Sequence, residues 1–370
     1  MDPIAILVTV LGLLVLFLGM GIWVGLGLFC VAITSLALFR SMPVDKLAAQ
    51  LTYNTVTTPE LVALPMFILM AEVLFHTKLS TSLFNGLAPW TSRLPGKMMH
   101  VNILGCTLFA AISGSSAATA ATVGRITLTE LFKRGYDRDL VIGSLAGAGT
   151  LGFLIPPSII LIIYGVLTET SILKLFLAGI IPGLLLAASF MTYLAIRTML
   201  NPSLVPAETA KAGWMDRLRG LVDLGPVLFL IVLVLGSMYA GFASPSEAAA
   251  VGVLGAFIIS AVQKTLNFKT FQSACLGAVR TTSMIALIVA GATFLSVSMA
   301  YLGVPRLIAT EIAALNLSPM ALILLLLVFY AVLGCVLDGL SAIVMTLPIT
   351  LPLVLAAGFD KIWFGVVVVI

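Results

Sequence analysis

Two stretches of this sequence carry residue types that could coordinate a cation at membrane depth. One reads SGSSAAT at residues 113–119, and the other reads GFLIPPS at residues 152–158. Proline has no N–H to donate, so the double proline leaves backbone carbonyls without a helical partner. Backbone that cannot stay helical persists in a membrane only where it is buried in protein or lines a wet cavity. Hydroxyls and freed carbonyls can together bind sodium without burying a net charge, and discontinuous helices are where such sites form.

The elements that would position these stretches are a helical hairpin and a broken helix. The apolar run at 101–112 is twelve residues long, too short to cross a hydrocarbon core of about 30 Å. A return limb at 115–132 follows the break at Ser113-Gly114 and ends before Lys133-Arg134. Length therefore favours a re-entrant hairpin over about 98–132, although two full spans stay open. The stretch at about 140–168 is predicted to be a helix broken at Pro156-Pro157.

The composition is that of an all-α polytopic membrane protein. Hydrophobic residues make up 61% of the chain and charged residues 9%, against about 25% charged in soluble domains. The first apolar stretch, 4–39, contains no charge and follows only Met-Asp-Pro. A cleaved signal would carry a basic start, so we expect retained membrane segments. They form either one long tilted helix or two helices meeting near 19–21.

Lysine and arginine gather in four intervals that predict the orientation in the membrane. These intervals are 93–97, 133–138, 197–219 and 264–269. The positive-inside rule places all four in the cytoplasm. An even number of crossings separates each pair if 101–132 is one hairpin, which agrees with that placement. Further apolar spans are expected at 171–196, 224–239, 248–262, 283–302, 320–337 and 341–357.

Two short patterns recur in the same order and suggest an internal repeat. LGCTL at 104–108 returns as LGCVL at 333–337, and GYDR at 135–138 returns as GFDK at 358–361. We therefore divide the chain into N-terminal scaffold helices at 1–60, a first repeat at 61–200, a cytoplasmic loop at 201–223 and a second repeat at 224–370. The second half stops soon after GFDK, so we expect it to be truncated before a second Pro-Pro break.

Two charged residues stand out inside apolar stretches. In the second half of the chain, Asp338 occupies the place that corresponds to the serine-rich stretch at 113–119, the tip of the predicted hairpin. An ionisable group at membrane depth is functional by default. Its alternative is a helix end at the interface. Arg125 lies among threonines on the return limb, where its guanidinium could hold a substrate carboxylate through two parallel hydrogen bonds. Its alternatives are to snorkel to the interface or to pair with Glu130.

The remaining reactive side chains give little support to enzyme chemistry. The four cysteines have no metal-type spacing and are expected to be buried thiols: Cys30, Cys106, Cys275 and Cys335. The two histidines, His76 and His100, fall at predicted loop edges. A metal site or a histidine-activated serine is therefore poorly supported.

Taken together, five motifs resemble the large membrane subunit, the dicarboxylate-type M subunit, of TRAP (tripartite ATP-independent periplasmic) transporters. They are the 113–119 tip, Gly135-Tyr136, residues 152–158, Ile181-Pro182-Gly183 and SPSEA at 244–248. The resemblance covers nearly the whole chain and implies inverted repeats with two re-entrant hairpins and an elevator-type, sodium-coupled importer in the bacterial inner membrane. It also implies a small four-helix membrane subunit, a periplasmic substrate-binding protein and a carboxylate substrate such as a C4-dicarboxylate or a sugar acid like sialic acid. By this resemblance, we expect the chain to end before the C-terminal stretch in which the family carries its second Pro-Pro motif.

The resemblance also assigns roles to particular residues. The first sodium would lie at Ser113, Ser115, Gly152, Ile155 and Pro157, mostly on backbone oxygens. The repeat extends this to a second sodium at Gly334, Asp338 and Gly339. The substrate carboxylate would meet Ser116, Thr119 and Arg125. Helix packing by small residues is the alternative role of the serines.

Two other classes of protein also use such features. An ion channel uses broken helices, but the short repeated filter and the acidic rings of channels are missing here. An intramembrane protease would need a histidine or a second aspartate at membrane depth beside Ser115 or Asp338. We therefore expect a transporter subunit that is not an enzyme and whose only cofactor is the coupling sodium ion.

Overall fold

The computed structural model describes residues 3–206, 213–305, 307, 310, 318–335 and 337–370. Over these residues the regular secondary structure is entirely helical. Six of the described helices are long and apolar enough to cross a membrane, or seven if the bent pair Val44–Val56 and Pro59–Phe75 forms one span. This confirms the predicted all-α polytopic membrane protein. The inverted repeat and the elevator motion stay predictions.

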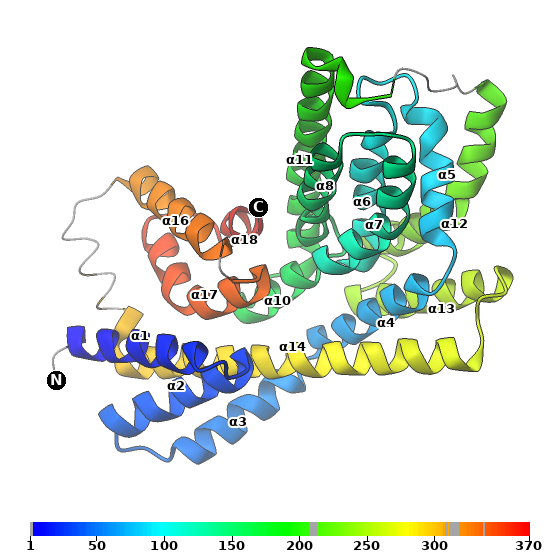
Figure 1. Ribbon diagram of the computed structural model, residues 1–370. Helices are drawn as coiled ribbons and strands as arrows, with labels where there is room; N and C mark the ends of the chain where they lie inside the picture. Colours follow the sequence, from blue (N-terminus) through cyan, green and yellow to red (C-terminus); the bar gives the residue numbers. More distant parts are fainter. Residues whose placement is uncertain (1–2, 207–212, 306, 308–309, 311–317, 336) are drawn as a thin grey trace. The chain divides into compact units, whose positions relative to one another are not determined.

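The described contacts group the chain into two units (Figure 1). Unit 1 comprises 1–61, 163–170 and 280–370, and unit 2 comprises 62–162 and 171–279. Both units combine stretches that are far apart in the sequence, whereas the predicted division was linear. The grouping follows contacts, so the repeat boundaries remain predictions.

Unit 1 begins with two helices where the sequence left one or two open. Helix α1 (Pro3–Gly19) and helix α2 (Val24–Phe39) pack against each other. The turn between them contains Gly21 at φ +76°, a backbone conformation that glycine adopts without steric cost. The other elements of this unit are α3 (Val44–Val56), the C-terminal part of α14 (Phe268–Leu302), α16 (Pro319–Gly334), α17 (Gly339–Ala356) and α18 (Lys361–Val369).

Unit 2 is built around α6 (His100–Ser113), whose residues are almost all buried. It contacts α7 (Ser116–Lys133), α8 (Arg138–Gly149), α9 (Leu151–Leu154) and α11 (Ile172–Leu200), and Figure 1 shows these helices gathered together. Small residues allow this crowding: the nearest atom to a Cβ placed at Gly105 would be a methyl of Val123, at 3.3 Å. The other elements are α4 (Ala63–Phe75), α5 (Leu79–Thr91), α10 (Ile159–Thr168, which continues into unit 1), α12 (Trp214–Tyr239), α13 (Pro245–Val262), the start of α14, and the short 3₁₀ segments η2 (Lys97–Met99) and η3 (Pro202–Leu204). The 3₁₀ segment η1 (Pro59–Val62) belongs to unit 1 except for its last residue.

Two helices begin before the apolar spans that the sequence predicts at 224–239 and 283–302. Helix α12 starts at Trp214, so 214–223 of the predicted 201–223 loop is helical, whereas 207–212 lie outside the described residues. Helix α14 starts at Phe268 rather than near 283. The Asn267 side chain accepts a hydrogen bond from the Thr270 N–H at 2.8 Å and begins it. Hydropathy detects the part of a helix that lies in lipid, and polar turns at its end escape it.

The cysteines differ from the expectation that all four are buried. Cys106 is buried, Cys30 and Cys275 are half-buried, and Cys335 is exposed at the end of α16. Apolar sequence around a cysteine does not separate a protein-facing side chain from one that faces outward.

The two copies of the recurring Gly-aromatic-Asp pattern adopt the same local structure. Gly135 and Gly358 both have positive φ, +80° and +87°. Asp137 then accepts a hydrogen bond from the Leu140 N–H and begins α8. Asp360 accepts hydrogen bonds from two backbone N–H groups and begins α18. The sequence repeat therefore corresponds to a repeated helix-to-helix connection.

Candidate functional site

The hairpin tip is a two-residue interruption between α6 and α7. Helix α6 ends at Ser113, and Gly114 takes the left-handed conformation at φ +60° while its N–H bonds to the Ala110 carbonyl at 3.0 Å. This is the usual way for glycine to terminate a helix. Ser115 then begins α7, because its hydroxyl accepts from the Ala118 N–H. The predicted break therefore exists and is stabilised from both sides.

Buried hydroxyls gather immediately behind this tip. The Ser113 and Thr119 hydroxyls lie 2.8 Å apart, and both residues are fully buried. The Ser113 hydroxyl is also 3.4 Å from the Ser115 carbonyl oxygen. Thr119, predicted as a substrate residue, therefore belongs to the same cluster as the predicted ion ligand Ser113. Ser116 is the first residue of α7 and is half-buried.

The second predicted break lies between α9 and α10. Helix α9 ends at Leu154, and a cis peptide bond joins Pro156 to Pro157. The helical donors for the Gly152 and Phe153 carbonyls would be residues 156 and 157, which are prolines without an N–H. The Ser158 hydroxyl bonds to the Phe153 carbonyl instead. The sequence expectation of freed carbonyls is thus met at Gly152.

The tip and the break contact each other directly. The Ile159 N–H donates to the Gly114 carbonyl at 3.1 Å. A Cβ placed on Gly152 would lie 2.7 Å from the Ser115 carbonyl oxygen, and one placed on Gly114 would collide with the Pro157 carbonyl. Residues some forty positions apart therefore share one buried region, which brings Ser113 and Ser115 beside Gly152 and Pro157.

Two glycines on α11 also shape this region. A Cβ at Gly179 would lie 2.7 Å from the Leu154 carbonyl oxygen, and one at Gly183 would lie 2.9 Å from the Ile155 side chain. They let α11 approach the two residues that immediately precede the double proline. The available signal was their spacing of four residues, which is the small-residue pattern of close helix packing. Gly183 belongs to the Ile181-Pro182-Gly183 motif, which by itself predicts no role for it.

The second predicted ion set lies in unit 1. Helix α16 ends at Gly334, and α17 begins at Gly339. The Asp338 carboxylate accepts from the Ser341 N–H at 3.1 Å and so acts as the N-cap of α17. Asp338 and Gly334 are exposed. Asp338 therefore lies at a helix end, as its alternative role predicts. The role of Asp338 as a sodium ligand stays a prediction.

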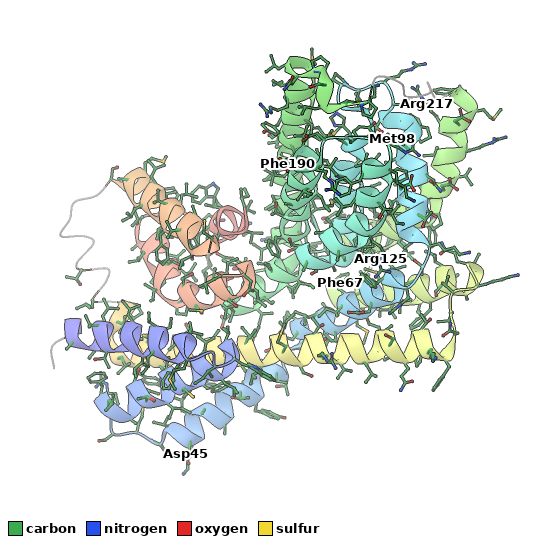
Figure 2. The ribbon with its side chains drawn as sticks, viewed as in Figure 1. Asp45, Phe67, Met98, Arg125, Phe190 and Arg217 are labelled. Atoms are coloured by element: carbon green, nitrogen blue, oxygen red, sulfur yellow. The ribbon has the colours of Figure 1, made fainter. Side chains whose placement is uncertain are left out.

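Arg125 lies away from the tip. Its guanidinium carbon is 5.0 Å from the centroid of the Phe75 ring, in a cation–π geometry, and its position on α7 can be followed in Figure 2. Nine residues separate it from Ser116, about 14 Å along a helix. In the described part of the chain, Glu130 pairs with Arg134 at 3.5 Å and Lys133 at 4.0 Å. The alternative in which Arg125 pairs with Glu130 is therefore not what the structure has.

The described residues offer the site neutral oxygens. Among them, no group of three or more His, Cys, Asp and Glu side chains could hold a metal ion. Unit 2 instead presents the buried hydroxyls of Ser113 and Thr119 at the tip, and against the tip lies Gly152, whose carbonyl has no helical donor. Such a set suits a weakly held monovalent cation at a discontinuous helix.

Comparison with known proteins places this arrangement in context. A family model described as "Tripartite ATP-independent periplasmic transporter, DctM component" matches residues 11–370. The isethionate TRAP transporter permease protein DctMQ of Oleidesulfovibrio alaskensis is 32% identical over 100% of this chain and 57% of its own length. The C4-dicarboxylate TRAP transporter large permease protein DctM of Rhodobacter capsulatus is 29% identical, over 98% of this chain and 84% of its own. The sialic acid TRAP transporter large permease protein SiaM of Vibrio cholerae is 32% identical, over 96% and 82%. The chain thus spans somewhat more than half of the first relative and most of the other two.

Proposed function

Because the chain belongs to the DctM component family of tripartite ATP-independent periplasmic transporters, we propose that it is the large membrane permease of a sodium-coupled importer. Its relatives are named as transporter permease proteins. The chain is accordingly a transporter subunit rather than an enzyme, which removes the intramembrane protease alternative. Membership of a secondary transporter family also disfavours the ion channel.

The observation that carries the sodium proposal is the contact between the hairpin tip and the double-proline break. The Gly114 carbonyl accepts from Ile159, and Gly152 lies against the Ser115 backbone. This contact supports a sodium ion held by oxygens of Ser113, Ser115, Gly152, Ile155 and Pro157. Thr119 would hold the Ser113 hydroxyl in position. An ion that joins two separate segments would stabilise the contact between the tip and the break, and this differential stabilisation would couple ion binding to transport.

The substrate proposal rests on the relatives and on residues near the tip. Relatives are named for isethionate, C4-dicarboxylate and sialic acid, so we propose an organic acid with a carboxylate or similar anionic group. Ser116 and Thr119 would meet it at the tip. Arg125 would have to leave Phe75 to reach it, and the second set at Gly334, Asp338 and Gly339 would hold a further sodium.

The proposed partners follow from the family. We propose a small membrane subunit and a periplasmic binding protein that delivers the substrate at the bacterial inner membrane. One relative is a permease protein named DctMQ whose length this chain covers to 57%. The rest of such a longer chain is where a covalently joined small subunit would be found.

The test is uptake into proteoliposomes that contain the full protein with its small partner and a cognate binding protein. Sodium and proton gradients are imposed separately. We expect uptake to follow the sodium gradient, and Ser113→Ala to raise the sodium concentration at half-maximal uptake by about tenfold or more, the effect of losing one hydrogen-bonding ligand to a charge. In the same assay, Arg125→Gln should raise KM for the substrate and leave the sodium dependence unchanged.

The matched control is Thr107→Ala. This hydroxyl lies on the same helix α6 and, among the described residues, bonds only to the Ile103 carbonyl of its own turn, at 2.8 Å. It should leave the sodium dependence unchanged. Uptake that ignores the sodium gradient would refute the coupling, and equal behaviour of the Ser113 and Thr107 variants would refute the site. A wild-type KM in Arg125→Gln would remove the substrate role of Arg125.

A further inference from the structure

A cavity separate from the candidate ion site lies toward the opposite end of α6 from the hairpin tip. It has a volume of about 810 Å³ and is lined by α6, α8, α11 and η3, all within unit 2. Its lining residue on α6 is Ile103. Ten residues separate Ile103 from Ser113, about 15 Å along a helix. None of the candidate ion-site residues lines it, so the cavity is distinct from that site.

The body of the cavity is an apolar groove between α8 and α11. Leu140, Gly143 and Gly147 line it from α8, and Phe190 and Leu194 line it from α11, where Figure 2 marks Phe190. A Cβ at Gly143 would meet no atom within 4 Å, and one at Gly147 would lie 3.6 Å from the Phe190 ring. The groove thus reaches the backbone of α8. Both helices belong to candidate membrane spans, so hydrocarbon chains are the surrounding solvent.

Three charged side chains line the cavity: the carboxylates of Asp137 and Asp139 and the guanidinium of Arg197. Asp139 lies in the first turn of α8 and Arg197 in the last turn of α11, and both line the cavity. Across the described residues, the salt bridges join Glu130 to Lys133 and Arg134 and involve neither of these two side chains. The neighbouring Asp137 carboxylate already accepts from the Leu140 N–H at 2.9 Å. Asp139 and Arg197 are therefore available to a ligand at the helix ends, where headgroups lie.

We propose that this cavity holds one zwitterionic phospholipid of the ethanolamine type. Its phosphate would meet the Arg197 guanidinium, whose planar set of donors suits phosphate oxygens. Its primary ammonium would donate to the Asp139 carboxylate, and one acyl chain would lie along Gly143 and Gly147. An anionic glycerol headgroup would leave Asp139 facing negative charge, and a choline headgroup has no N–H to donate.

The test counts lipids that remain bound to the purified full-length protein by native mass spectrometry. The protein is delipidated and then offered equal amounts of phosphatidylethanolamine, phosphatidylglycerol and phosphatidylcholine. We expect one retained phosphatidylethanolamine in the wild type. Arg197→Gln should lower its occupancy by about tenfold or more, the effect of losing a hydrogen bond to a charged group. Asp139→Asn should instead bring phosphatidylglycerol up to the level of phosphatidylethanolamine.

Filling the groove gives an independent arm. Gly143→Leu should expel the lipid because its side chain enters the open space, whereas the small Gly143→Ala should retain it. The matched controls are Gly225→Leu, another open glycine on α12 outside the cavity, and Arg219→Gln, an exposed arginine on the same helix. Thermal melting identifies any variant that fails to fold. Equal retention of all three lipids, no retained lipid, or full retention in Gly143→Leu would each overturn the proposal.

Discussion

At the residue scale, the candidate ion site depends on glycines that let two backbones touch. Gly152 lies in a helix with ordinary φ, so its requirement is purely steric. The nearest atoms to an added Cβ are the Ser115 carbonyl carbon and oxygen, at 2.7 Å, and the Ser116 nitrogen, at 2.8 Å. Backbone atoms cannot move aside as a flexible side chain can. One methyl group would therefore push the hairpin tip away from the break.

Gly152→Ala should consequently destabilise the protein and weaken its sodium response. Overpacking of a tight contact costs about 1–3 kcal/mol, which outweighs the gain of about 1 kcal/mol that alanine brings to a helix. We expect a lower Tm and a higher sodium concentration for half-maximal protection against unfolding. Thermal melts with and without sodium measure both.

Gly225→Ala serves as the comparison, because a Cβ at Gly225 on α12 would meet no atom within 4 Å. It should keep or raise the Tm. A Gly152→Ala protein that melts like Gly225→Ala, with the same response to sodium, would mean that the tip and the break are not held together as described.

At the element scale, aspartates begin three helices that follow a break or a turn. Asp137 begins α8, Asp338 begins α17 and Asp360 begins α18. In each case the carboxylate accepts from a backbone N–H of the first turn, where the helix dipole also favours negative charge. Only Asp338 was also predicted to bind sodium. Capping and ion binding make different demands on the side chain, which allows them to be separated.

Substitution of Asp338 by asparagine and by alanine separates the two roles. Asparagine caps helices about as well as aspartate, whereas alanine costs about 1 kcal/mol. If Asp338 binds sodium as we propose, Asp338→Asn should keep the wild-type Tm in sodium-free buffer but raise the sodium requirement for uptake. Asp338→Ala should lower the Tm as well. Asp360→Ala, which removes a cap from α18, provides the structural comparison, with a lower Tm and an unchanged sodium requirement. An Asp338→Asn protein with wild-type sodium dependence would leave Asp338 as a cap alone.

At the scale of the whole molecule, the basic intervals bear on how the chain lies in the membrane. Within unit 2, three of the four predicted intervals meet at the open end of the hairpin. The Lys97 ammonium bonds to the Pro206 carbonyl at 2.7 Å, the Asp137 N–H to the Leu204 carbonyl at 3.2 Å, and the Met98 N–H to the Tyr136 hydroxyl at 3.3 Å. These contacts support one shared cytoplasmic face.

Cysteine labelling in intact spheroplasts tests this orientation. The starting protein replaces Cys30, Cys275 and Cys335 with serine and keeps the buried Cys106. A cysteine in place of Phe242, which is 88% exposed in the turn between α12 and α13, should react with a membrane-impermeant maleimide from outside. A cysteine in place of Lys133 should react only after permeabilisation. The opposite pattern would reverse the orientation.

Sequence reasoning predicted the local features of this protein well. The helix breaks at Ser113-Gly114 and Pro156-Pro157, the hairpin limbs and the membrane class all follow from hydropathy, glycine and proline, because these act within a few neighbouring residues. It missed the polar extensions of α12 and α14, the exposure of Cys335 and the support that Gly179 and Gly183 give to the break. The polar turns of α12 and α14 escape because hydropathy detects only the part of a helix that lies in lipid. The exposure of Cys335 and the contacts of Gly179 and Gly183 depend on what lies beside each residue in space.

What the sequence by itself determined, then, is an all-helical membrane protein of the DctM family with two interrupted segments rich in oxygen ligands. Only the tertiary structure decided that these interruptions meet, that Thr119 joins Ser113, and that Arg125 lies over Phe75 instead of at the tip. The physical reason is the separation along the chain of the residues that each feature involves. A break in a helix is set by the residues at that point, whereas the contact between Gly114 and Ile159 exists only because α7, α8 and α9 pack around α6.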